Sequence, residues 1–185
     1  VELGEQAFSQ ALRSVSENGY EENIEVIRGD IREIKKNIPH PTLDLAACNP
    51  PYKAVGAGLR NPDERMENAR HECTCTLEDV AKAGRDVLRF GGRLCLCQRP
   101  ERLADAMNVF RSYGLEPKRL RLVQQRINTA PSLFLLEVRR GGKPGLSVLP
   151  TLIIEDENGG FSAEMLEIYG NYKFGHEGGR ADGRK

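Results

Sequence analysis

The chain has 185 residues, enough for one domain with a sizeable hydrophobic core. Its 27 lysine and arginine residues balance its 27 aspartate and glutamate residues, and no apolar run approaches the roughly 18 residues of a membrane-spanning helix. The five cysteines are an odd number, lie mostly in apolar runs and follow no signal peptide. We therefore expect a soluble protein with reduced cysteines in the cytoplasm, not a membrane protein or a secreted disulfide scaffold.

The charges are unevenly distributed along this neutral chain. Residues 98–143 carry ten basic and four acidic side chains, whereas the regions on both sides of this segment are net acidic. A locally basic segment is typical of a phosphate-binding surface, but solvated strand and loop positions would give the same pattern. Charge alone leaves both interpretations open.

The first 70 residues predict short elements in which helices and strands alternate. Asn18-Gly19 ends the first helix, and β-branched residues mark the strand that follows it. In chain order we expect the end of a strand at residues 1–3, a helix over 6–18, a strand over 24–27, a helical stretch over 31–36, a strand over 43–48 and a mobile loop over 53–70. The apolar composition of residues 43–48 indicates a strand that is buried on both faces.

The second half continues the alternation. Thr76 is a good N-cap with Asp79 three residues later, and the apolar spacing that follows is helical until Gly91-Gly92. The remaining predicted elements are a strand over 93–98, a helix over 100–113, strands over 117–125 and 132–139, an extended segment over 149–154 and a helix over 163–169. Residues 1–174 should form the domain, and the Gly- and charge-rich residues 175–185 a disordered tail.

Alternating strands and helices predict an α/β sandwich around a mostly parallel sheet. Ligands of such folds bind beyond the carboxyl ends of the strands. Asp30 and Asn49 each follow a predicted strand directly. We therefore expect these two polar residues along the same edge of the sheet.

The chemistry of the second strand end lies in Asn49-Pro50-Pro51-Tyr52. The prolines stiffen the backbone and remove two N–H donors, which leaves the Asn49 carboxamide oxygen and the Pro50 carbonyl as a rigid pair of acceptors. Such a pair can accept both hydrogens of an exocyclic amine, and the Tyr52 ring can stack on a base. The alternative is an ordinary Pro-Pro turn with Asn49 as a cap and Tyr52 on the surface.

The tetrapeptide resembles the catalytic motif of class I S-adenosylmethionine-dependent amino methyltransferases. A longer ordered set resembles the bacterial tRNA1(Val) (adenine-N6)-methyltransferase family over about residues 1–172. The set comprises Arg70-His71-Glu72, Thr76-Leu77-Glu78-Asp79, Gly91-Gly92-Arg93-Leu94, Arg99-Pro100-Glu101-Arg102-Leu103, Gly114-Leu115-Glu116-Pro117-Lys118-Arg119-Leu120-Arg121 and Glu167-Ile168-Tyr169-Gly170.

The resemblance implies a Rossmann-like methyltransferase that transfers a methyl group from S-adenosylmethionine to N6 of the adenine beside the anticodon of a valine tRNA. Glu2 corresponds to the acid that binds the cofactor ribose, and Asp30 to the acid that contacts the cofactor adenine. Asn49, Pro50, Pro51 and Tyr52 correspond to the target-base residues, with Asn49 also bordering the cofactor. From its position alone Asp30 is equally a helix N-cap, and both roles are compatible.

The family also has a first strand that ends in a Gly-rich turn around the methionine part of the cofactor. The sequence begins after the position of that strand, so the resemblance implies an N-terminally incomplete domain. We expect these 185 residues alone to bind S-adenosylmethionine weakly and to be inactive.

Four cations of the basic segment are candidates for phosphate contacts: Arg99, Lys118, Arg119 and Arg121. We expect no metal, because His71, Cys73 and Cys75 lack a second ligand pair at zinc-like spacing. Two other functions stay open. The same tetrapeptide serves methyltransferases of glutamine side chains and of ribosomal RNA guanine, and the chain could instead be a non-catalytic RNA-binding remnant. The oligomeric state cannot be inferred.

Overall fold

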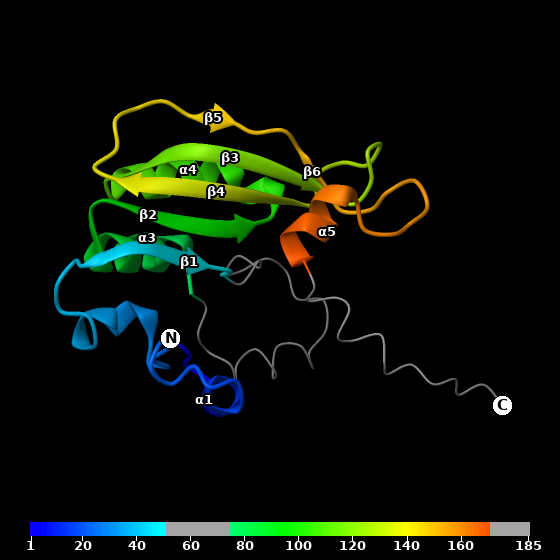
Figure 1. Ribbon diagram of the computed structural model, residues 1–185. Coiled ribbons are helices and arrows are strands. Elements are labelled where there is room, and N and C mark those ends of the chain that lie inside the picture. The colour runs from blue at the N-terminus through cyan, green and yellow to red at the C-terminus, as the bar shows by residue number, and fades with distance from the viewer. Residues whose placement is uncertain (51–74, 171–185) are drawn as a thin grey trace, which may run out of the picture.

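The computed structural model describes residues 1–50 and 75–170, which form a mixed α/β sheet with helices (Figure 1). Its strands are β1 (Leu43–Cys48), β2 (Leu88–Gln98), β3 (Leu115–Gln124), β4 (Leu133–Arg140), β5 (Ser147–Val148) and β6 (Leu152–Ile153). Its helices are α1 (Glu5–Glu17), the 3-10 helix η1 (Ile31–Lys36), α3 (Leu77–Val87), the 3-10 helix η2 (Pro100–Arg102), α4 (Leu103–Ser112) and α5 (Ala163–Tyr169).

The strand order is β1-β2-β4-β3-β5, and β6 also pairs with β3. β1 and β2 are parallel, β4 is antiparallel to both β2 and β3, and β5 and β6 are parallel to β3. The prediction of a mostly parallel sheet therefore holds for strand direction, since only β4 of these six strands runs the other way, but the two antiparallel ladders of β4 make the sheet mixed. The carboxyl ends of β1, β2 and β3 consequently lie at one edge, where Asn49, Arg99 and Gln125 follow them.

One face of the sheet is covered by α3 and α4, which also contact each other (Figure 1). The predicted cap of α3 is present as a reciprocal pair: Thr76 Oγ1 accepts the Asp79 N–H at 3.1 Å, and the Asp79 carboxylate accepts the Thr76 N–H at 3.0 Å. The core between helices and sheet is fully apolar at its centre. Its largest completely buried side chains are Phe110, Phe134, Leu88, Leu115, Leu136 and Val138.

Within residues 1–50 and 75–170 the opposite face has only the short α5 against it, at one end, where Met165 shares a buried cluster with Val123 of β3; the rest of this face is uncovered. On that face Leu45 of β1 is 52% exposed and Leu135 of β4 is 37% exposed. The expectation that residues 43–48 are buried on both faces is therefore wrong: from Leu45 to Cys48 exposed and half-buried residues alternate, because only one side of β1 packs against a helix. The outer edge of β1 also has no strand partner in the described ranges.

Two further element predictions need correction. Residues 24–27 form no strand, and the segment makes only an isolated parallel bridge between Glu2 and Arg28, because residues 1–3 are its sole described pairing partner. β2 begins at Leu88, not at residue 93, and it accommodates Gly91, which has a φ of 81°, within a shift of register against β1. The glycines are thus a strand irregularity and not the stop that the sequence predicted.

Residues 1–3 likewise form only the isolated bridge at Glu2 and no strand, whereas the other elements are confirmed within one to three residues at their ends, including η1, α4, β3, β4 and α5. The predicted loop 53–70 and tail 175–185 lie outside the described residues. Within the described ranges, every helix is too short or too polar to cross a lipid bilayer.

Candidate functional site

A cavity of about 680 Å³ lies between the N-terminal segments and the sheet. Its lining includes Glu2, Asp30 and Asn49, the three residues that the sequence assigned to cofactor binding. The remaining lining is mostly apolar and comes from the segment around η1, from β1 and from α3: Val1, Leu3, Gly29, Ile31, Ile34, Ile38, Leu43, Ala46, Ala47, Cys48, Pro50, Cys75, Val80, Ala83, Gly84, Val87 and Leu94. The fold therefore brings together, around one space, polar groups that are up to 47 positions apart in the numbering.

Glu2 is held at this cavity by backbone pairing. Its N–H donates to the Ile27 carbonyl at 2.9 Å, and its carbonyl accepts the Gly29 N–H at 3.0 Å. This short parallel bridge places Glu2 beside Asp30, which follows Gly29 in the chain. Two carboxylates consequently share one wall of the cavity.

Asp30 is fixed by Arg32. As the N-cap of η1, its Oδ1 accepts the backbone N–H of Arg32 at 2.9 Å, and Arg32 Nε donates to Oδ1 at 3.0 Å and to Oδ2 at 2.8 Å. The Arg32 side-chain hydrogen bond lowers the pKa of the Asp30 carboxyl below its ordinary value, against the opposing effect of burial. The N-cap role is thus confirmed, and it coexists with the position on the cavity wall. Sequence analysis missed Arg32, although its spacing of two from a capping aspartate is a usable signal.

Asn49 and Pro50 extend from the end of β1. Asn49 is exposed and Pro50 is buried, so the proline anchors the strand end while the carboxamide stays accessible. Pro51 and Tyr52, the other half of the predicted base-holding motif, lie outside the described residues.

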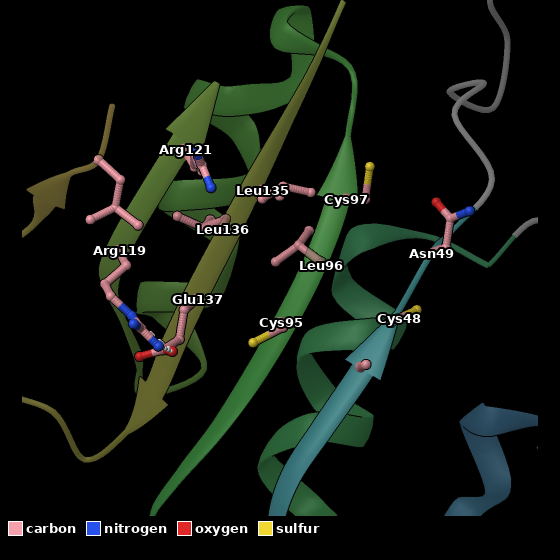
Figure 2. Close-up of a pocket in the computed structure, with 12 residues that line it drawn as sticks. Cys48, Asn49, Cys95, Leu96, Cys97, Arg119, Arg121, Leu135, Leu136 and Glu137 are labelled. Atoms are coloured by element: carbon pink, nitrogen blue, oxygen red, sulfur yellow. Dashed lines mark hydrogen bonds and ion pairs between the residues drawn. The ribbon is translucent and has the colours of Figure 1, made fainter. Parts of the chain in front are cut away.

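Asn49 also lines a second cavity, of about 480 Å³, on the uncovered face of the sheet (Figure 2). Across that face the strands place Cys97, Leu135 and Arg121 in one row, because Leu135 pairs with both of the other two. The parallel register of β1 and β2 continues this row to Asn49. The floor of the second cavity is therefore apolar, with Asn49 at one end and Arg121 at the other.

The three predicted phosphate-binding cations on β3 bond to other groups of the protein. Lys118 Nζ donates to the Lys143 carbonyl at 3.1 Å, Arg119 forms an ion pair with Glu137, and Arg121 bonds to Glu164 at 2.6 Å and to the Pro150 carbonyl at 2.9 Å. The fourth, Arg99, is exposed and lies at the carboxyl end of β2, on the same edge as Asn49. The structure thus brings Arg99 to the site edge and places the other three across β3.

The described residues hold no cluster of three or more potential metal ligands, and their cysteines 48, 75, 95 and 97 are free thiols. Burial raises the pKa of Cys75 to about 11 and also raises that of Cys48. Cys95 and Cys97 are half-buried and line the cavity on the uncovered face. His71 and Cys73 lie outside the described residues.

Comparison with known proteins gives a consistent assignment. A tRNA1(Val) (adenine(37)-N6)-methyltransferase from Tolumonas auensis is 30% identical over 172 residues, which cover 91% of this chain and 68% of the relative. The chain belongs to this family. A Porphyromonas gingivalis protein of the same name is 28% identical over 173 residues, with 91% and 67% coverage, and one from Parabacteroides distasonis is 26% identical over 172 residues, with 91% and 69% coverage. No protein-family model matches the chain.

Solved structures agree with this methyltransferase family at the level of the fold. A predicted O-methyltransferase from Agrobacterium tumefaciens superposes with a TM-score of 0.68 at 18% identity and covers 90% of this chain and 74% of its own. The M protein of the type I restriction enzyme EcoKI superposes with a TM-score of 0.55 at 16% identity, with 90% and 38% coverage. The mixed α/β sheet of this family member therefore has the fold of class I methyltransferases.

Proposed function

We propose that the chain belongs to an S-adenosylmethionine-dependent methyltransferase that modifies N6 of an adenine in tRNA. In this enzyme the chain binds the target base and the adenosine half of the cofactor. By analogy with the relatives, the target is the adenine beside the anticodon of a valine tRNA. One observation carries the proposal: Glu2, Asp30 and Asn49 line a single cavity at the carboxyl edge of the sheet in a member of this family. Because the relatives are tRNA-modifying enzymes, we also propose a cytoplasmic location.

The large cavity fits the adenosine half of the cofactor. Glu2 and Asp30 supply carboxylate acceptors for ribose hydroxyls and the adenine amine, and side chains such as Ile31 and Ile34 supply an apolar wall for the ring. Within the described residues no run of glycines and no cationic side chain faces this cavity, so the methionine half finds less support there. When bound, S-adenosylmethionine supplies the electrophilic methyl group.

The acceptor side of the reaction is assigned to the strand-end tetrapeptide. The Asn49 carboxamide oxygen and the Pro50 carbonyl would accept the two amine hydrogens of the target adenine. These bonds orient the nitrogen lone pair toward the methyl donor and favour tetrahedral geometry at nitrogen. Tyr52 is assigned a stacking role on the flipped base. No strong general base is needed, because the proton can leave to solvent after the methyl transfer.

A chimera provides the direct test. The part of the Tolumonas auensis protein that lies outside its match to this chain is joined to residues 1–185, and the product is incubated with labelled S-adenosylmethionine and valine tRNA. We expect labelled N6-methyladenosine in the tRNA, and a loss of about 100-fold or more in kcat for Asn49→Ala, as for removal of a single preorganised hydrogen-bonding group in an active site. A matched control is Asn108→Ala, on α4 and remote from the strand ends.

Other substrates define the outcomes that would contradict the proposal. Label in a release-factor glutamine or in ribosomal RNA guanine, with none in tRNA, would replace the tRNA assignment. Binding of tRNA without any methylation by the chimera would favour a non-catalytic RNA-binding protein.

We further propose that Arg99, Lys118, Arg119 and Arg121 contact tRNA phosphates. Each phosphate contact that is lost should reduce the slope of log affinity against log salt by up to about one unit. The fourfold alanine variant of the chimera should therefore bind tRNA more weakly and with a shallower salt slope. The control pair Lys82→Ala and Arg85→Ala, on exposed positions of α3, should leave the tRNA affinity and its salt slope unchanged. An unchanged slope in the fourfold variant would show that these four side chains do not contact tRNA phosphates.

A further inference from the structure

Arg32 bonds to Asp30 in two separable ways. Its backbone N–H caps η1 through Asp30 Oδ1 at 2.9 Å, which any residue except proline at position 32 can do. Its guanidinium contacts both carboxylate oxygens, with Nε at 3.0 Å from Oδ1 and 2.8 Å from Oδ2, and Nη2 also bonds to Oδ2. The backbone bond explains the fold of the segment, and it leaves the guanidinium contacts without a role in capping.

Asp30 and Arg32 differ in their position relative to the large cavity. Asp30 lines the cavity, whereas Arg32 does not. The Asp30 side chain is 22% exposed and that of Arg32 is 45% exposed, so the guanidinium is the more solvent-exposed partner. Arg32 therefore holds Asp30, a lining residue, from a position outside the cavity lining.

We infer that Arg32 is a positioning residue that fixes the Asp30 carboxylate to accept one hydrogen bond from the adenine amine of a bound adenosine. The inference rests on the adenosine-binding role proposed for the cavity. It extends that role to a residue which touches no ligand.

The acceptor capacity of the carboxylate supports a single remaining bond. An ionised carboxylate offers about four lone-pair positions. Three N–H hydrogens of Arg32 reach the carboxylate: the backbone N–H on Oδ1, the Nη2 hydrogen on Oδ2, and the single Nε hydrogen, which the two oxygens share at 3.0 and 2.8 Å. Three hydrogens on about four positions leave room for one ligand donor. An adenine amine can donate there, whereas the carbonyl oxygen of hypoxanthine would repel the charge.

Adenosine binding to residues 1–185, followed by NMR chemical-shift titration, tests the inference, with inosine as the probe that lacks the amine. Arg32→Ala keeps the backbone cap and the carboxylate but removes the fork. We expect it to weaken adenosine binding about 2- to 10-fold, the effect of having to immobilise one side chain on binding, and to reduce the preference over inosine. Arg32→Lys should recover part of the loss, since it restores the charge without the planar fork.

Two matched variants interpret the result. Arg28→Ala removes an equal charge from the same segment, where Arg28 contacts only exposed Glu5 at 3.5 Å among its described ion pairs, and should bind adenosine like the parent chain. Asp30→Ser keeps a capping side chain and removes the carboxylate, so it should lose the preference for adenosine over inosine.

Each contrary outcome has a distinct meaning. Parent-like affinity and base preference in Arg32→Ala, together with a defect in Asp30→Ser, would overturn the positioning role but leave Asp30 as a ligand contact. No adenosine binding by the parent chain, or no defect in Asp30→Ser, would overturn the inference together with the role of Asp30. Neither result depends on tRNA methylation by the chimera, which tests the proposed function separately.

Discussion

Residues 1–185 should bind S-adenosylmethionine hardly better than adenosine. The large cavity offers Glu2 and Asp30 to the adenosine half, and its described lining contains no cationic side chain or glycine turn for the methionine carboxylate. The perturbation is therefore made in the ligand: adenosine, then S-adenosylmethionine, titrated into the same chain by calorimetry.

The expected magnitude follows from the missing bonds. Each charge-assisted hydrogen bond contributes about 1.5–3 kcal/mol, and two of them would tighten binding by at least about 100-fold. Without such bonds the methionine half adds little to the binding free energy. The dissociation constants of adenosine and S-adenosylmethionine should therefore agree within about tenfold. We expect both in the millimolar range, since each carboxylate contact must also offset the loss of ligand freedom.

Micromolar affinity for S-adenosylmethionine, with adenosine at least 100-fold weaker, would refute this reasoning. It would mean that groups beyond the described lining bind the methionine half. The chimera is the positive control, because it should show the large affinity difference that residues 1–185 lack.

Three smaller predictions concern the surroundings of the site. Thr76→Ala should destabilise the chain by about 1 kcal/mol through loss of the α3 cap, measured by urea unfolding, whereas Thr42→Ala, at an exposed hydroxyl outside any helix cap, should change the unfolding free energy by less than about 0.5 kcal/mol. With a pKa of about 11, the Cys75 thiol should react with iodoacetamide slowly at pH 8 and about tenfold faster per pH unit up to that pKa; rapid modification at pH 8 would contradict its burial. Arg121→Met should accelerate amide hydrogen exchange in α5, because Arg121 links β3 to Glu164 at 2.6 Å, and unchanged exchange would show that the link contributes nothing.

The features that sequence predicted correctly are those with local causes. The Thr76–Asp79 spacing predicts a reciprocal cap, and that cap is present. The apolar run that ends at Asn49 predicts a strand with polar chemistry at its carboxyl end, and β1 ends at Cys48. Both depend on contacts within about four residues, so the residues themselves contain the information.

The features that sequence missed depend on distant partners. The β-branched residues 24–27 suggest a strand, but a strand requires a neighbour, and the segment pairs only once, with Glu2. Burial of Leu45 depends on what covers its face of the sheet, which the apolar run cannot specify. The fork between Arg32 and Asp30 lies between close residues, yet it matters only because Asp30 faces a cavity built by α3 and β1.

The position of Asn49 shows why a motif and a fold give different information about the same residue. The tetrapeptide predicts the chemistry, an acceptor pair suited to an amine. Side chains of a strand point alternately to its two faces, so residues within β1 should each serve one side. Asn49 lies just beyond the strand and lines both the 680 Å³ and the 480 Å³ cavities. A carboxamide at this junction can accept a bond from a group that enters from either side of the sheet, which is the geometry that a transfer between two bound molecules requires.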